Sequence, residues 1–180
     1  MIESKFEYIL THSYKADLIS YLKTHPEDFE EAIILAVSDK QAYSWRAAWL
    51  IWSCMERNDR RIQKYTAKII DILPEIIDRQ ARELLIILQK MELSDELEGR
   101  LFDICITIWK KTGKQPSLRY NAFKLMTGIV KKHPALVTEL KFLTETQYTE
   151  SLSENVKKSV SGMLEEVKKS TDKFKNNQKK

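Results

Sequence analysis

Four arginines are the side chains in this sequence best suited to bind an anion: Arg46, Arg79, Arg82 and Arg119. Each lies near the start of a segment with helical periodicity. If these segments line one side of the molecule, the guanidinium groups form a common ridge that can clamp carboxylates or other anions. The alternative is a ladder of ion pairs that joins neighbouring helical repeats. The pattern favours the ladder and leaves the ridge, together with Trp45, as the candidate binding site.

Three tryptophans could supply an aromatic surface. Trp45, Trp49 and Trp52 follow i, i+4, i+7 spacing, so they share one face of a helix. Such a stripe can stack on a ligand, a base or a partner protein. It can equally be core packing, since a tryptophan buries a large area. The segment 41–57 is apolar nearly all round, which favours the core interpretation.

The residue types that support catalysis or metal binding are scattered. His12, His25 and His133 are far apart in the chain, and a metal site needs clustered ligands. Cys54 and Cys105 lie inside apolar helical patterns with no zinc or disulfide spacing. No Gly-rich phosphate loop or nucleophile–base motif stands out. We therefore predict no catalytic residues, no metal and no cofactor.

The positive charge of the chain is concentrated at its C-terminal end. The net charge is +4, but residues 156–180 hold eight lysines against three acidic residues, a net of +5. The preceding residues hold 22 basic and 23 acidic side chains, a net of −1, which lacks the broad basic footprint of a dedicated nucleic-acid binder. We expect the basic residues 175–180 to be a mobile tail, with the last helix ending near Phe174.

The elements that carry these side chains are expected to be helices. Glycine and proline number only 4 each, which argues against sheets and hairpins. Apolar residues recur with helical spacing throughout, and no convincing stretch alternates as a strand does. No apolar run reaches the roughly 18 residues that a membrane span needs. The expected helices cover residues 2–10, 18–22, 26–37, 41–57, 62–73, 75–91, 97–109, 118–133, 136–143 and 153–174.

Three of the expected helices open in a similar way. Each has an arginine, then an alanine within three residues, then bulky aliphatic residues. Ala48, Ala81 and Ala122 lie 33 and 41 residues apart, within the range of two-helix repeats. The three openings read Trp45-Arg46-Ala47-Ala48, Arg79-Gln80-Ala81 and Arg119-Tyr120-Asn121-Ala122.

These openings resemble HEAT repeats, whose second helix often begins with an aliphatic–Arg pair followed by alanine, with an aspartate upstream. The resemblance spans about residues 26–133, and it implies an all-α, ARM-type α-α superhelix of about four antiparallel helix pairs with the second helices on the concave side. The chain departs from the pattern where Trp45 replaces the aliphatic residue and where the repeat spacing is uneven. The matching positions are Leu118-Arg119 with Ala122, Asp78-Arg79, and Asp39 ahead of Arg46.

The length of 180 residues predicts a single helical-repeat domain over residues 1–180. The solenoid pattern and the lack of a catalytic motif favour a non-catalytic scaffold that binds a protein or peptide. With no secretory signal and no membrane span in the sequence, we expect it in the cytoplasm and away from membranes. The alternative is a DNA-binding protein, because the chain is similar at fold level to the bacterial DNA alkylation-repair glycosylases. Those enzymes use a concave face with Trp, Arg and an acidic residue, although their active-site pattern does not align here.

Overall fold

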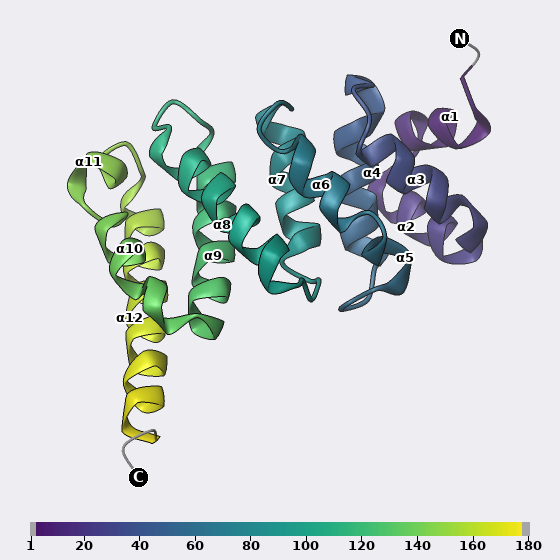
Figure 1. The fold of residues 1–180 in the computed structure, drawn as a ribbon. Helices are drawn as coiled ribbons and strands as arrows, with labels where there is room; N and C mark the ends of the chain where they lie inside the picture. The colour runs from purple at the N-terminus through teal and green to yellow at the C-terminus, as the bar shows by residue number, and fades with distance from the viewer. Residues whose placement is uncertain (1–2, 178–180) are drawn as a thin grey trace. The chain divides into compact units, whose positions relative to one another are not determined.

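The computed structural model describes the backbone of residues 3–177 and the side chains of residues 3–172, and every regular element in that range is helical (Figure 1). The all-α fold class is therefore confirmed. The chain divides into two compact units, Met1–Leu97 and Glu98–Lys180. We call them unit 1 and unit 2. That residues 1–180 form one domain stays a prediction.

Unit 1 is organised around α4, which packs against α1, α2, α3 and α7. Ala47 and Ala48 are fully buried, and their small side chains let the neighbouring helices approach α4 closely. The elements of unit 1 are α1 (Lys5–His12), α2 (Lys15–Thr24), a 3-10 helix (Pro26–Asp28), α3 (Phe29–Ala36), α4 (Gln41–Cys54), α5 (Arg60–Gln63), α6 (Thr66–Ile72) and α7 (Asp78–Leu88).

Unit 2 contains nearly all of α8 and the helices that follow it. The helix α9 packs against α12, and α10 packs against both. Val160, Leu164 and Val167 are buried and follow the helical spacing expected for the inner face of α12. The elements are α8 (Asp95–Lys110), α9 (Pro116–Lys132), a 3-10 helix (Pro134–Leu136), α10 (Val137–Phe142), α11 (Thr146–Thr149) and α12 (Glu154–Asn177).

The helix expected over 62–73 is interrupted in the structure. The buried Thr66 hydroxyl donates to the Gln63 carbonyl at 2.9 Å, and the Tyr65 amide bonds three residues back to Ile62. The bond from Tyr65 has the tighter spacing of a 3-10 turn and departs from the regular α-helical pattern. The chain forms α5 and α6 in place of one helix.

Two other helices differ from the prediction at their ends. The helix expected from residue 75 begins at Asp78, and α11 was not predicted because four residues carry too little periodicity. The helix α12 continues past Phe174 to Asn177. The side chain of Phe174 and residues 178–180 lie outside the described part of the chain, so the mobile tail over 175–180 stays a prediction.

The N-terminus of α1 carries an acid-sensitive contact. Glu7 is buried, completes a capping box with Ser4 and accepts a hydrogen bond from the Lys40 ammonium at 2.5 Å. The bond from Lys40 and the backbone bond from Ser4 hold the pKa of the Glu7 carboxyl below its ordinary value. The ionised carboxylate therefore ties α1 to the start of α4.

This contact predicts how stability depends on pH. A depressed pKa in the folded state stabilises the protein above the unfolded pKa of about 4.3, and this contribution is lost as pH falls through the folded value. Glu7→Gln should therefore cost about 1–2 kcal/mol at pH 7 and almost nothing at the acid end. Urea unfolding of both proteins between pH 7 and pH 3 measures the difference. A gap that persists unchanged at low pH would contradict the role of Glu7 ionisation.

Candidate functional site

The three tryptophans of α4 are half-buried, neither full core residues nor fully exposed. The rings of Trp49 and Trp52 meet edge to face with centroids 6.3 Å apart. The Lys15 ammonium lies 5.1 Å from the Trp49 ring centroid. Part of each indole thus packs inside unit 1 while part remains open to solvent. Core packing therefore accounts for part of each ring, and binding through the open part stays a prediction.

Arg79 of α7 lies on the ring of Trp45. The Cζ atom of its guanidinium is 3.2 Å from the Trp45 ring centroid, the distance of a close cation–π stack. The side chain of Arg79 is exposed. Among the described residues it makes no hydrogen bond and no ion pair by the usual distance criteria. The packing of α7 against α4 is what brings these two residues together.

Arg82 belongs to a small polar network one turn further along α7. Its guanidinium is ion-paired with Glu83, which is only 1% exposed. The other carboxylate oxygen of Glu83 accepts a 2.6 Å hydrogen bond from the Trp52 indole. Arg82 and Trp52 together satisfy this buried carboxylate. The ion pair of Arg82 joins neighbouring residues of one helix, so it is not the ladder between repeats that the sequence favoured.

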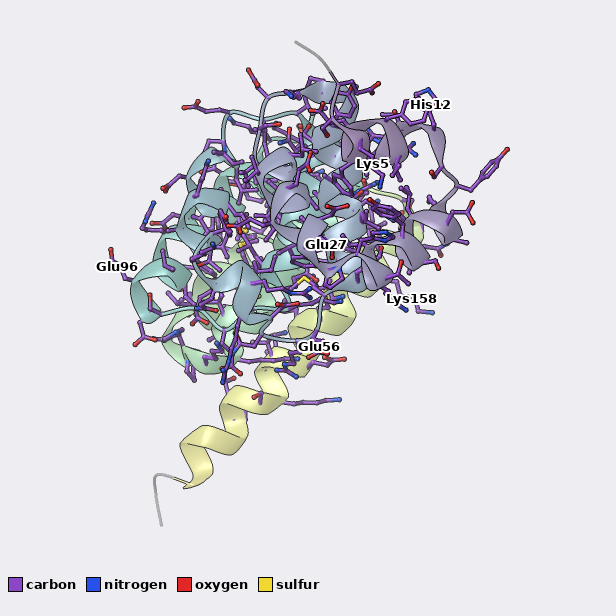
Figure 2. All side chains as sticks on the ribbon, turned by 90° about the vertical axis from the view of Figure 1, so that its right-hand side faces the viewer. Lys5, His12, Glu27, Glu56, Glu96 and Lys158 are labelled. Carbon is purple, nitrogen blue, oxygen red and sulfur yellow. The ribbon has the colours of Figure 1, made fainter. Side chains whose placement is uncertain are left out.

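Arg46 is turned toward the backbone of α1. Its Nε donates to the Leu10 carbonyl at 2.7 Å and its NH2 group to the Ser13 carbonyl at 3.3 Å. These carbonyls lie at the C-terminal end of α1, which His12 marks in Figure 2. The guanidinium therefore caps a helix end, where carbonyls lack helical partners and a positive charge is favourable. Its Cζ is also 5.6 Å from the centroid of the Trp45 ring.

Arg119 lies in unit 2 and is completely buried. It donates from Nε to the Trp109 carbonyl at 2.9 Å, from NH1 to the Ser151 hydroxyl at 3.0 Å, and from NH2 to the Tyr148 carbonyl. Burial lowers the pKa of Arg119. The structure thus brings Trp45, Arg46, Arg79 and Arg82 together in unit 1 and places Arg119 inside unit 2.

A second residue of the repeated opening has a role that the sequence did not reveal. Gln80, fully buried, donates from Nε2 to the carbonyls of Ala36 and Ser38, both at 2.9 Å, at the end of α3. Arg46 does the same for α1. Both donors stand directly before an alanine, Ala47 or Ala81, and that position is the signal that could have identified Gln80. In this register Arg79 aligns with Trp45, against which it packs.

The two cysteines and the buried carboxylate of Glu98 are the remaining candidates for chemistry among the described residues. Burial raises the pKa of both Cys54 and Cys105, which keeps the thiols protonated and disfavours a thiolate nucleophile. Glu98 is buried and accepts from Lys132 and, at 2.9 Å, pairs with the His133 ring.

Charge is divided unequally between the two units. Unit 1 carries 13 basic and 17 acidic side chains, a net of −4. Unit 2, over residues 98–180, carries 17 basic and 9 acidic ones, a net of +8. Part of that excess is α9, which contains four basic residues and no acidic one. The net charge of +5 on residues 156–180 therefore accounts for only part of the +8 of unit 2.

The helices pack against one another, and Arg46 and Gln80, at matching positions, each bind carbonyls at the end of an earlier helix. This repetition defines a helical-repeat protein. A family model of the HEAT repeat domain matches residues 5–167, so the chain belongs to the HEAT repeat family. No curated protein and no solved structure matches it. The fold-level similarity to DNA alkylation-repair glycosylases stays a prediction. Helices long and apolar enough to cross a membrane do not occur in the described part of the chain.

HEAT repeat domains are helical scaffolds that usually mediate interactions. We give the name Trp–Arg face to five residues of α4 and α7, which are the exposed Arg79 and the half-buried Trp45, Trp49, Trp52 and Arg82.

Proposed function

We propose that this chain is a non-catalytic, cytoplasmic interaction module that binds a protein or peptide through the Trp–Arg face. The observation that carries the proposal is the stack of Arg79 on Trp45, because it holds an exposed guanidinium in place without using any of its hydrogen-bond donors. Arginine and tryptophan are the residues most enriched among the energetic centres of protein interfaces. Half-buried indoles supply apolar contact area at little further entropic cost.

A comparison of captured proteins tests this function. The bait carries either the wild-type sequence or the double substitution Trp45→Leu, Arg79→Glu, and Arg57→Glu is the control because Arg57 is an exposed arginine of the same unit. A partner of the Trp–Arg face should be retained by the wild type and the control and weakened at least about tenfold by the double variant, the loss typical of removing an interface centre. Retention by all three baits would contradict the proposal.

Nucleic-acid binding is the second candidate, and the net charge of +8 in unit 2 favours it. Lys124 and Lys131 are exposed on α9 and could contact phosphates. Such contacts release counterions, so affinity should fall roughly 10³–10⁵-fold between low and moderate salt if about 6–10 phosphates are bound. Gel-shift assays with intact and alkylated duplex DNA at several salt concentrations measure this. If neither duplex shifts at low salt, this candidate fails.

A further inference from the structure

We propose that Arg79, held flat on Trp45, is a carboxylate-binding site that recognises an acidic side chain of a peptide partner. This inference rests on the proposed function and adds the chemistry of the ligand to it. The site consists of the in-plane N–H groups of one guanidinium, positioned by one indole, and its occupant is a Glu or Asp carboxylate.

The stack leaves the hydrogen-bonding edge of Arg79 available. The Cζ atom lies 3.2 Å from the Trp45 ring centroid, so the contact with Trp45 uses the face of the guanidinium. The five N–H groups of arginine lie in the guanidinium plane and point outward from its edge. Two of them match the two oxygens of a carboxylate in a bidentate pair. A guanidinium fixed in this way loses less side-chain freedom when the carboxylate arrives.

Other basic side chains of unit 1 already have carboxylate partners. Lys40 pairs with Glu7 at 2.5 Å, and Arg61 pairs with Asp59 at 2.6 Å. Arg79 has no described carboxylate within ion-pairing distance, and the same is true of Arg57 and Arg60. Arg79 differs from those two in that its guanidinium lies on the Trp45 ring, which orients it for a carboxylate.

Arg46 strengthens the local positive potential. Its Cζ lies 5.6 Å from the same Trp45 ring, and its Nε and NH2 groups bind the neutral carbonyls of Leu10 and Ser13. Hydrogen bonds to carbonyls satisfy the donors of Arg46 but do not cancel its charge. Two guanidinium groups therefore share one indole, and an anion beside Arg79 relieves the repulsion between them.

The surroundings favour a peptide carboxylate over a nucleic-acid phosphate. Unit 1 has a net charge of −4, which repels a polyanion approaching this face. A short acidic peptide carries few charges and meets less of that repulsion than duplex DNA does. The indole of Trp49, one turn from Trp45 and half-buried, offers apolar surface for the residue beside the acid.

Nitrogen-15 NMR of the full chain tests the site directly. The probe is an oligo-glutamate peptide, with oligo-glutamine as its uncharged match. Oligo-glutamate should shift the Arg79 Nε–H and Trp45 indole N–H signals saturably, and oligo-glutamine should not. The indole signal of the fully buried Trp109 in unit 2 should stay in place. Absence of saturable shifts at Arg79 would overturn the proposal.

Matched variants separate recognition from general charge attraction. Arg79→Gln should weaken oligo-glutamate binding at least about tenfold, a loss of roughly 1.4 kcal/mol. Arg79→Lys keeps the charge but not the planar fork, so it should also bind weakly. Arg57→Gln removes the same charge from another exposed position and should bind as the wild type does. Equal weakening by Arg57→Gln, or a stronger Arg79 response to duplex DNA than to oligo-glutamate, would refute carboxylate recognition.

The outcome also separates this inference from the proposed function. If the NMR signals of Arg79 ignore oligo-glutamate while a captured partner still depends on Trp45 and Arg79, only the carboxylate inference is wrong. If neither measurement depends on these residues, the binding role of the Trp–Arg face is wrong as well. An unchanged thermal melting curve for each variant confirms that the exposed substitutions leave the fold intact.

Discussion

Replacing Trp109 with alanine should destabilise unit 2 by about 3–5 kcal/mol, among the largest losses a single substitution causes. Trp109 is 0% exposed, its ring centroid lies 4.7 Å from that of Phe123, and its indole donates to the Leu143 carbonyl at 2.7 Å. The truncation removes the contact between α8 and α9 and leaves a buried carbonyl without its donor. Urea unfolding followed by circular dichroism measures the loss.

Two further variants divide this effect into its causes. Trp109→Phe keeps an aromatic ring but not the hydrogen bond, so it should cost about 1–3 kcal/mol, the penalty for an unsatisfied buried carbonyl. Trp49→Ala removes a tryptophan that is only half-buried, and it should cost less than Trp109→Ala. Equal losses for Trp49→Ala and Trp109→Ala would show that burial does not govern these two positions.

The helical pattern of the fold could be predicted from the spacing of apolar residues, because that spacing decides which face of a helix is buried. The same spacing does not reveal a break in the backbone bonding. The Tyr65 amide bonds to Ile62 three residues back, and two helices stand where one was predicted. Apolar periodicity carries no information about this break, since Ile62 and Ile69 are buried on either side of it.

The candidate site could be predicted only in part. The spacing of Trp45, Trp49 and Trp52 placed them on one helix face, but exposure depends on which helices cover that face. The sequence treated Arg46, Arg79 and Arg119 as equivalent because each opens a repeat. In the structure Arg46 binds carbonyls at the end of a helix, and Arg79 lies on an indole ring. Arg119 is buried. The repeated openings can instead be aligned one residue further along, so that Arg46 matches Gln80 and Trp45 matches Arg79. In that alignment Arg46 and Arg79 are no longer equivalent, in agreement with their different contacts.

Arg119 is a structural residue of unit 2, although the sequence made it a candidate binding residue. Its guanidinium joins the end of α8 to the segment around α11 through Trp109, Tyr148 and Ser151. It also lies 4.8 Å from the Trp109 ring centroid. Removing this guanidinium is costly, because the buried Trp109 carbonyl is left without its donor and the bonds to Tyr148 and Ser151 are lost.

Arg119→Met should therefore lower the free energy of unfolding by about 2–4 kcal/mol, since methionine fills the space but leaves the buried Trp109 carbonyl without its donor and removes the bonds to Tyr148 and Ser151. Lysine has one nitrogen and cannot reach three acceptors in different directions, so Arg119→Lys should also destabilise. Lys124→Met is the matched control, because Lys124 is exposed on the same helix, and it should change stability by less than about 0.5 kcal/mol.

The location of the damage gives a second readout for the Arg119 variants. Without the guanidinium, the segment that carries α11 loses its bonds to α9 and should open more often than the rest of unit 2. Glu145 and Glu150 are exposed in that segment, so a glutamate-specific protease should cleave there faster in Arg119→Met than in the wild type or Lys124→Met. If cleavage at these two sites is unchanged while stability falls, Arg119 supports α9 and α8 alone, and its bonds to Tyr148 and Ser151 do not hold α11 in place.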